Sequence, residues 1–482
     1  MADVVAIRQQ LQAHGQSHLL KFHDELSPQA QGALVDQLAA LDLDHLDSLI
    51  KQYVLGAPQV KLPSKIEPPQ IVSSRPTDAK QIDEQAKAKA LGTQLIAQGK
   101  VAAFVVAGGQ GTRLGYEGPK GCLEATPVAR KPLFQVFAEQ ILAASRRGGK
   151  AIPWYVMTSP ANDVATRAFF RQYRHFGLEA KDVFFLVQGT MPAIGTDGKI
   201  LLATKGELAL SPNGHGGSLE ALKKSGALAD MAARGIEYIS YFQVDNPLVQ
   251  CIDPLFIGLH AMRNAEMSAK VLPKRDPMEK LGNVCLADGR VTVIEYSDMP
   301  EELARRCNED GRLRFSAGSI AIHLLSRSFV ERLTAGGHLE LPYHRAEKKV
   351  STVNAAGDNV KPEQPNAVKL EMFVFDALPL AKASVILETL RTEEFSPVKN
   401  ATGEDSLTSS LHDQVRRWAT WLEKAGIQVP RDADGQVAAA IEISPLYADS
   451  AEELAAKIDP ALTIATGQSF YLGSRGQTGG LK

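Results

Sequence analysis

Six glycines, an arginine and a lysine lie within the stretch VVAGGQGTRLGYEGPKG, residues 105–121. Glycine lets the backbone come close to phosphate oxygens, and successive N–H groups can then act as donors. Arg113 and Lys120 can neutralise the charge of a phosphate chain. The apolar run VAAFVVA, which includes the start of this stretch, is typical of a central strand buried on both faces. The combination predicts a polyphosphate-binding loop at the end of a strand, rather than a glycine-rich surface turn.

The spacing of the glycines excludes two familiar phosphate loops. A Walker A loop has the pattern GxxxxGK followed by Ser or Thr, whereas Lys120 follows Pro119 and precedes Gly121. The dinucleotide fingerprint has the pattern GxGxxG, and counted from Gly109 its third glycine would fall at Leu114. The same spacing argues against a nicotinamide-dependent oxidoreductase.

Alternating strands and helices must position this loop. Apolar runs predict strands, and amphipathic stretches predict helices between them. The expected strands are 101–107, 152–159, 182–189 and 236–245, and the expected helices are 133–147 and 163–177. Such alternation indicates an α/β domain with a mostly parallel sheet, whose ligands bind beyond the carboxyl ends of the strands. Gln188 and Asp245 lie at such ends, as does the glycine loop.

Composition excludes several other classes of protein. The chain has 482 residues and a net charge of -2, which argues against a nucleic-acid or membrane-surface partner. Its four cysteines form no CxxC pair and show no zinc-ligand spacing, as expected in a reducing compartment. The start of the chain lacks the pattern of a secretory signal, and no apolar run is long enough to cross a bilayer. A cytoplasmic protein is therefore expected.

The glycine loop resembles the signature of UTP-dependent sugar-1-phosphate uridylyltransferases of the eukaryotic type, and most closely the UDP-N-acetylglucosamine and UDP-N-acetylgalactosamine pyrophosphorylases. Further segments are similar to this family and follow in its order. They are MTSP, VQGTMPAI, SPNGHGGSLEAL, QVDNPLVQCIDPLFIG, IEYSDMP, FSAGSIAIHLL, VKLEMFVFD and LRTEEFSPVKNA. The resemblance covers about residues 10–425.

The resemblance and the pattern of elements together imply an α/β fold. A central Rossmann-like, mostly parallel mixed sheet of the nucleotide-diphospho-sugar transferase (glycosyltransferase-A-like) type is expected, with an N-terminal helical extension and a small C-terminal α+β domain. The predicted domains are a helical region with a proline-rich strap at 1–99, a nucleotidyltransferase domain at 100–380, and the α+β domain at 381–482. In the first of these, Ser27 and Pro28 are expected to begin a helix.

Site residues follow from the resemblance, position by position. The resemblance implies catalytic roles for Arg113, Lys120 and Lys399. It implies that Asp245 is a Mg²⁺ ligand, with Asn246 as a candidate for an additional ligand. A carboxylate suits Mg²⁺, because this hard cation prefers oxygen ligands that it shares with phosphates. The implied nucleotide-binding residues are Gly108, Gly109, Gly111, Thr112, Gln188, Gly214 and Lys369. The implied sugar-binding residues are His215, Gly282, Glu295, Tyr296, Ser319 and Phe375.

The expected reaction joins UTP and a hexose 1-phosphate to give a UDP-sugar and pyrophosphate, with N-acetylglucosamine 1-phosphate as the expected sugar substrate. Two departures from the N-acetylglucosamine enzymes keep UDP-glucose or a broad range of UDP-sugars open. His215 replaces an asparagine, as in UDP-glucose and broad-range enzymes, and Ser316 and Ser319 also stand where asparagines are usual. A non-catalytic UDP-sugar sensor is a second alternative. A monomer or weak dimer is expected.

Overall fold

The computed structural model describes residues 3–56, 63–336 and 339–473 and divides them into two compact units. The first unit combines residues 1–62, 188–218 and 340–376, and the second combines 63–187, 219–339 and 377–482. Each unit therefore collects segments that are far apart in the sequence. The predicted domain boundaries at 99/100 and 380/381 stay a prediction, because compactness does not test which segments fold independently.

A large mixed sheet forms the centre of the second unit. Its main path runs in the order β2-β20-β12-β15-β11-β3-β4-β5. The strands are β2 (Ile71–Val72), β3 (Val101–Val106), β4 (Trp154–Thr158), β5 (Val183–Val187), β11 (Tyr238–Gln243), β12 (Met267–Pro273), β15 (Ala317–Ser326) and β20 (Ile386–Glu388). Neighbouring strands are parallel except at β15, which is antiparallel to both β11 and β12. A side branch of the sheet holds β1 (Ile66–Glu67), β13 (Asn283–Ala287) and β14 (Arg290–Ile294).

Fully buried apolar strands explain why this sheet is central. Every residue of β4 is buried, and β3 is buried up to its last residue, as the continuous apolar runs predict. The helices of this unit are α4 (Ala79–Ala97), α5 (Leu133–Gly148), α6 (Asp163–Gln172), α8 (Ala227–Ala233), α9 (Pro254–Met262), α10 (Glu301–Ala304), α11 (Arg327–Leu333) and α12 (Arg391–Glu394). Side chains of α5, such as Phe134 and Phe137, join those of β3 and β4 in one apolar core.

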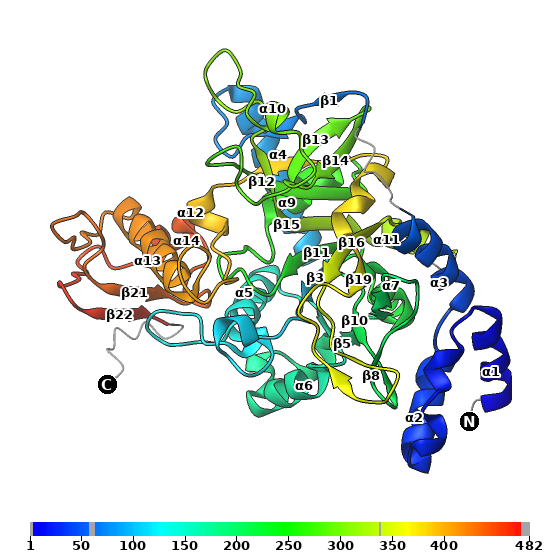
Figure 1. Ribbon diagram of the computed structural model, residues 1–482. Coiled ribbons are helices and arrows are strands. Elements are labelled where there is room, and N and C mark those ends of the chain that lie inside the picture. Colours follow the sequence, from blue (N-terminus) through cyan, green and yellow to red (C-terminus); the bar gives the residue numbers. More distant parts are fainter. Residues whose placement is uncertain (1–2, 57–62, 337–338, 474–482) are drawn as a thin grey trace. The chain divides into compact units, whose positions relative to one another are not determined.

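The C-terminal elements of the second unit gather beside one another, as the orange and red ribbons show (Figure 1). They are α13 (Leu407–Lys424), α14 (Ala451–Lys457), β21 (Ala440–Ile443) and β22 (Ser469–Leu472). Ser406 caps α13 by accepting a hydrogen bond from the Ser409 N–H, as the sequence predicts for a serine N-cap. The two strands pair in parallel and share an apolar cluster with α13 and α14.

The first unit has its own apolar core, which combines N-terminal helices with small sheets. Its helices are α1 (Val4–Ala13), α2 (Pro28–Ala39) and α3 (Leu43–Leu49). Its strands are β6 (Thr190–Pro192), β7 (Ile194–Gly195), β8 (Leu202–Thr204), β9 (Glu207–Leu208), β10 (Leu210–Pro212), β16 (Tyr343–Lys348), β17 (Thr352–Val353), β18 (Asn359–Val360) and β19 (Ala367–Met372). Helix α7 (Gly217–Lys224) begins at the end of this unit's middle segment. The predicted helix start is confirmed, because the Ser27 hydroxyl accepts from Ala30 N–H and Pro28 is the first helical residue.

One expectation about local structure needs correction. The helix predicted for 163–177 ends at Gln172, and Arg174, His175 and Phe176 have positive φ values of 49°, 50° and 54°. The Phe176 ring packs against Phe169 and Phe170, so tertiary contacts override the helical pattern. Within the proline-rich strap, residues 57–62 lie outside the described residues, and the remainder contributes the short strands β1 and β2 to the large sheet.

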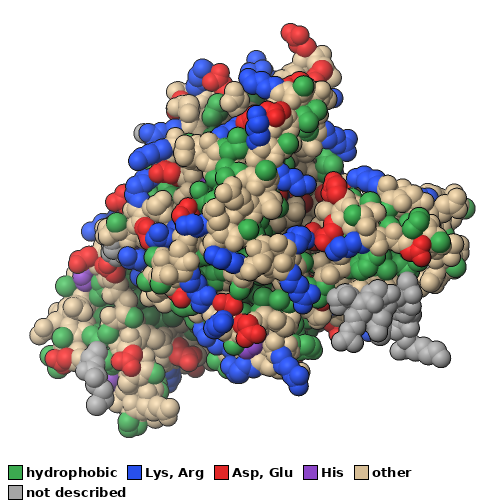
Figure 2. Space-filling model, turned by 180° about the vertical axis from the view of Figure 1, so that it is seen from behind, with side chains coloured by type: hydrophobic (Ala, Val, Ile, Leu, Met, Phe, Trp, Pro, Cys, Tyr) green, Lys and Arg blue, Asp and Glu red, His purple; other side chains and the backbone are tan. Residues whose placement is uncertain are grey.

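Surface charges of both signs are interspersed on the face drawn in Figure 2, which agrees with a net charge of -2. Across residues 3–56, 63–336 and 339–473, no helix combines the length and the apolar character needed to span a bilayer. The predicted fold class is confirmed, because the sheet is a mostly parallel mixed sheet within an α/β chain.

Candidate active site

The glycine loop follows β3 and folds back on itself. Gly111 N–H donates to the Gly118 carbonyl at 2.9 Å, and Lys120 N–H donates to the Gly109 carbonyl at 3.1 Å. These bonds close the loop into a narrow hairpin whose ends lie at the carboxyl edge of the sheet. Thr112 and Arg113 lie at the exposed tip of this hairpin, within a short 3₁₀ turn, whereas Lys120 is half-buried at its base. The sequence therefore places one cation at the tip of the loop and another at its base.

Two buried side chains between β4 and α6 hold the first peptides of the loop. The Asn162 amide nitrogen donates to the carbonyls of Ala107 and Gly109, at 2.9 and 3.2 Å. The Ser159 hydroxyl donates to the Gly108 carbonyl at 2.8 Å. In a trans peptide the C=O and the following N–H point in opposite directions. The N–H groups of residues 108–110 are therefore turned away from this support, as a phosphate-binding nest requires.

Lys120 and Asp245 meet at the ends of β3 and β11, which are adjacent parallel strands. Lys120 Nζ lies 4.0 Å from Asp245 Oδ2 and donates to the Val398 carbonyl at 3.3 Å. Asp245 is 9% exposed. A cation and a buried carboxylate therefore share one edge of the sheet, next to the glycine loop.

The segment that carries Lys399 is bonded to the same edge. Val398 N–H donates to the Asp245 carbonyl at 2.8 Å, and Lys399 N–H donates to the Asp405 carbonyl at 2.6 Å. Burial raises the pKa of Asp405, with Asp245 acting in the same direction and Lys399 opposing it. Lys399 is exposed at this edge, where its side chain can reach a ligand. Asp405 is a site residue that the sequence reasoning missed, and its place in GEDS, shortly before a helix cap, gave no signal beyond a turn.

A second group of predicted residues surrounds the junction of β13, β14 and β15. Ser319 N–H donates to the Gly282 carbonyl at 2.8 Å. A Cβ on Gly282 would lie 2.6 Å from Val293 Cγ1 and 3.4 Å from Glu295 Oε1, so only glycine fits there without displacing its neighbours. Tyr296 is 38% exposed. Gly282, Glu295 and Ser319 are thus brought together, as a sugar subsite would require.

The remaining predicted residues belong to the first unit. Gln188 is buried, and its amide nitrogen donates to the Gly214 carbonyl at 2.6 Å. Gly214 has a φ of +86°, and a Cβ there would lie 2.3 Å from the Met372 carbonyl oxygen, so this position accepts only glycine. These two predicted nucleotide-binding residues are therefore fixed to one another.

Three aromatic rings stack beside Gly214. The Phe373 ring lies between His215 and His344, with centroid separations of 5.0 and 4.2 Å. His215 Nδ1 accepts from Val374 N–H at 3.1 Å, which makes Nε2 the protonated nitrogen of a neutral ring. Phe375 is buried, and its ring lies 5.8 Å from that of His215.

Lys369 takes part in an ion pair within the first unit. Its Nζ lies 2.5 Å from Glu371 Oε1, and both residues belong to β19. An ion pair of this kind lowers the net positive charge that Lys369 presents to a ligand. The predicted role of Lys369 toward a nucleotide stays a prediction, as do the substrate roles of the other site residues.

The geometry of the second unit supports chemistry on a phosphate chain. The glycine loop, the cations Arg113, Lys120 and Lys399, and the carboxylate of Asp245 come from segments that the topology brings to one sheet edge. Such an arrangement orients polyanions and stabilises charge that develops during transfer of a phosphoryl or nucleotidyl group.

The comparisons with known proteins agree with this site. The family model for UTP–glucose-1-phosphate uridylyltransferase matches residues 43–422. A UDP-N-acetylhexosamine pyrophosphorylase-like protein 1 from Xenopus tropicalis is 38% identical over 93% of this chain and 92% of its own length. A UDP-N-acetylglucosamine diphosphorylase 2 from Arabidopsis thaliana is 35% identical over 97% of this chain and 92% of its own. Among solved structures, the uridine diphosphate N-acetylglucosamine pyrophosphorylase of Trypanosoma brucei has a TM-score of 0.78 and 28% identity, covering 95% of each chain.

The fold and the site are those of a nucleotidyl-transferring α/β enzyme with a glycine-rich loop at the carboxyl edge of its sheet. The chain belongs to the UTP–glucose-1-phosphate uridylyltransferase family. The resemblance noted from the sequence is therefore confirmed, as is the prediction that the chain is a uridylyltransferase.

Proposed function

We propose that this protein transfers the uridylyl group of UTP to N-acetylglucosamine 1-phosphate, giving UDP-N-acetylglucosamine and pyrophosphate. The observation that carries the proposal is the meeting of Lys120, Asp245 and the Lys399 segment beside the glycine loop. Relatives that match nearly the whole chain are named for N-acetylhexosamine or N-acetylglucosamine substrates, which supports this choice of sugar.

In the proposed reaction a phosphate oxygen of the sugar 1-phosphate attacks the α-phosphorus of UTP. The new P–O bond forms as the bond from the α-phosphorus to the β-phosphate oxygen breaks, and pyrophosphate leaves with that electron pair. The nucleophile is already an anion at neutral pH, so the reaction requires no covalent enzyme intermediate. One phosphoanhydride replaces another, and the reaction is therefore expected to run in reverse with pyrophosphate.

The protein's task in this reaction is to hold two polyanions together. The turned-out N–H groups of residues 108–110 are placed to cradle the triphosphate, with Arg113 at the tip of the loop and Lys120 at its base. Lys399, which is exposed at the same edge, would meet the sugar phosphate. Preorganised donors and cations of this kind stabilise the charge that accumulates in the transition state, because they need no reorganisation during the reaction.

The residues at this edge fit a Mg²⁺ ion. Magnesium is typically bound by one or two carboxylates together with substrate phosphates and water. Asp245 provides such a carboxylate. No cluster of three or more His, Cys, Asp or Glu side chains that could hold a metal occurs within the described part of the chain, which favours an ion shared with the substrate. When bound, Mg²⁺ would neutralise phosphate charge.

UDP-glucose, or a broad range of UDP-sugars, is the second candidate product. Ser316 and Ser319, in the second unit, stand where asparagines are usual in the N-acetylglucosamine enzymes, and His215, in the first unit, also replaces an asparagine. Serine leaves more room and fewer amide donors than asparagine. These replacements favour a hexose without an acetamido group.

A panel of sugar 1-phosphates tests both candidates. The purified chain is given UTP, Mg²⁺ and one sugar phosphate at a time, and pyrophosphate release is measured. The proposal predicts the highest kcat/KM with N-acetylglucosamine 1-phosphate, whereas equal or higher values with glucose 1-phosphate would favour the second candidate. Binding of UDP-sugar without any pyrophosphate release or exchange would indicate a sensor. We also propose a cytoplasmic location and a monomer or weak dimer, which cell fractionation and size-exclusion chromatography would test.

A further inference from the structure

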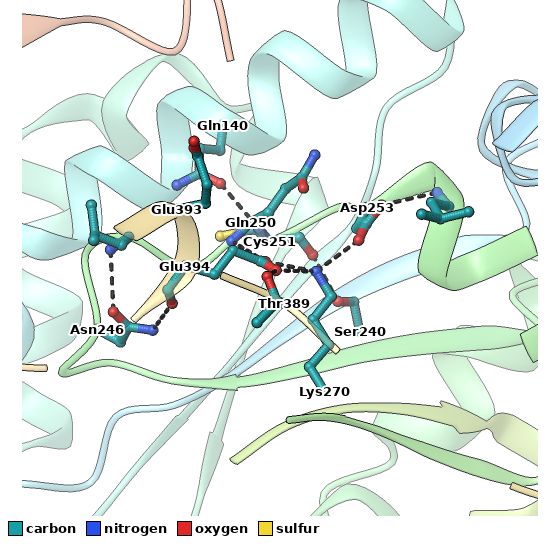
Figure 3. Close-up of polar contacts among 12 residues, drawn as sticks. Gln140, Ser240, Asn246, Gln250, Cys251, Asp253, Lys270, Thr389, Glu393 and Glu394 are labelled. Carbon is teal, nitrogen blue, oxygen red and sulfur yellow. Dashed lines mark hydrogen bonds and ion pairs between the residues drawn. The ribbon is translucent and has the colours of Figure 1, made fainter. Parts of the chain in front are cut away.

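Asn246 follows the carboxylate of Asp245 and is buried, with 5% of its surface exposed. Its side-chain nitrogen donates to the Glu394 carbonyl at 2.7 Å (Figure 3). Its side-chain oxygen accepts from Ser396 N–H at 3.1 Å. The same oxygen also accepts from Leu248 N–H at 3.3 Å. Because both ends of the amide are bonded to backbone groups, Asn246 is not available as the additional Mg²⁺ ligand considered from the sequence.

These bonds join the two segments that carry the site's charged side chains. One segment continues β11 and holds Asp245, and the other runs from Glu394 to Lys399. The Asn246 amide forms hydrogen bonds with backbone groups of Glu394 and Ser396 in the second segment. Two residues after Ser396, Val398 N–H donates to the Asp245 carbonyl. The spacing between Asp245 and Lys399 is therefore set by three consecutive cross-links, two of which use one side chain.

A buried ionic cluster anchors the far side of this connection, as Figure 3 shows. Both oxygens of the Glu394 carboxylate accept from Lys270 Nζ, at 2.6 and 2.7 Å, and one also accepts from the Thr389 hydroxyl at 2.5 Å. Asp253 lies 2.7 Å from the same ammonium. Burial alone would lower the pKa of Lys270, but Asp253 and Glu394 outweigh it and keep that pKa raised. Glu394 is therefore held in place by a charged partner.

We propose that Asn246 is a positioning residue for uridylyl transfer, which sets the distance between Asp245 and Lys399 without contacting substrate. This inference rests on the proposed function. Asn246 would affect the chemical step indirectly, by fixing the position of Lys399. The Lys270–Glu394 cluster would hold Glu394 in place, so that the Asn246 amide can fix the segment from Glu394 to Lys399.

A double-mutant cycle tests this role. Displacing a catalytic group by about 1 Å can cost about 10²-fold in rate, so Asn246→Ala is expected to lower kcat by about that factor, with little change in KM for UTP. In a Lys399→Ala background the same substitution is expected to change kcat by less than about threefold, because residues that act through one another are not additive. The proposal would be overturned if Asn246→Ala lowered kcat by the same factor in the native and the Lys399→Ala backgrounds. An unchanged kcat in Asn246→Ala would also overturn it.

Matched variants separate positioning from loss of structure. Ser240→Ala removes a buried hydrogen bond to the Cys251 carbonyl, 2.7 Å long, in the same region but outside the Asp245–Lys399 connection. It is expected to keep kcat per folded molecule, and a loss equal to that of Asn246→Ala would contradict the proposal. If Asn246→Ala does not fold, Thr389→Val serves in its place, since it weakens the Glu394 anchor. It should lower kcat several-fold in the native background and leave kcat unchanged in Lys399→Ala.

The design also distinguishes this inference from the proposed function. If the native chain releases no pyrophosphate with any sugar phosphate, the proposed function fails. If the native chain is active and the cycle is additive, only the positioning role of Asn246 fails.

Discussion

Lys120 Nζ lies 4.0 Å from Asp245 Oδ2, although 125 residues separate the two positions in the chain. The distance allows electrostatic attraction without a direct hydrogen bond, and Lys120 instead donates to the Val398 carbonyl. The Lys120 ammonium group can therefore still donate hydrogen bonds to a ligand. Its charge stays at the sheet edge where β3 and β11 end. The pair therefore links the glycine loop to the proposed metal ligand before any substrate binds.

Replacing Lys120 by alanine is expected to lower kcat by about 10²–10³, because removal of one preorganised charge from a transition state has about that cost. The fold should persist, since Lys120 is half-buried and its side chain is not part of the apolar core. Initial rates of pyrophosphate release, with circular dichroism of the variant, check both statements. Lys87→Ala, which removes an exposed lysine paired with Asp83, is the matched control. A Lys120→Ala variant with native kcat would remove the loop lysine from the chemistry.

The support beneath the glycine loop is expected to matter for UTP more than for the sugar phosphate. Asn162→Ala removes the donors to the Ala107 and Gly109 carbonyls. Each net hydrogen bond contributes about 1 kcal/mol, so the KM for UTP is expected to rise by about 10–100-fold as the loop loses its orientation. The KM for the sugar phosphate should change little. Steady-state kinetics with each substrate varied in turn measure both values, and the exposed Asn354→Ala is the control. Equal rises in both KM values would show a general loss of structure instead.

A methyl group at position 282 is expected to affect the sugar alone. In Gly282→Ala the new Cβ would meet Val293 Cγ1 at 2.6 Å and come within 3.4 Å of Glu295 Oε1. Displacement of these neighbours should raise the KM for the sugar 1-phosphate by about tenfold or more, since a misplaced polar contact costs about 1–2 kcal/mol. The KM for UTP is expected to stay native. Gly289→Ala, at a turn with no atom within 4 Å of the added Cβ, controls for loss of a glycine, although its φ of +83° adds some strain. A native KM for the sugar would exclude this subsite.

The sequence predicts the central strands and the loop well, for a local reason. Continuous apolar runs such as VAAFVVA fit only a strand buried on both faces, and the glycines that follow must lie at its carboxyl end. Pairing between distant strands has no such local signal. The insertion of β15 as an antiparallel strand between β11 and β12, for example, depends on partners far along the chain.

The charged residues of the candidate site could be predicted from the sequence. Side chains that support the loop through hydrogen bonds to its backbone were harder to predict. Lys120 and Asp245 were identified, and the structure places them together. Ser159 was noted only as part of the similar segment MTSP, and Asn162 was not singled out, because a serine and an asparagine in a turn are usually caps. Their bonds to the loop carbonyls arise from the parallel pairing of β3 with β4, which sequence spacing does not reveal.

Two buried histidines are expected to make the fold sensitive to acid. Burial lowers the pKa of His260 to about 3 and that of His323 to about 4. Each is therefore neutral in the folded chain, whereas an unfolded histidine takes up a proton below about pH 6.5. Their contribution to stability is complete above that pH. It falls by about 1.4 kcal/mol per pH unit for each histidine as the pH drops toward the folded pKa, because the unfolded chain then binds more protons.

The variant His323→Phe separates this effect from the titration of carboxylates. It removes one of the two buried histidines that stay neutral in the fold but bind a proton in the unfolded chain. The apparent unfolding temperature is therefore expected to fall less steeply between pH 7 and pH 4.5 than in the native chain, even if the two chains differ in unfolding temperature at pH 7. His412→Phe replaces an exposed histidine and should leave the slope unchanged. Parallel curves for native and His323→Phe chains would mean that His323 does not stay neutral in the fold. In that case the acid sensitivity would have to come from other titratable groups.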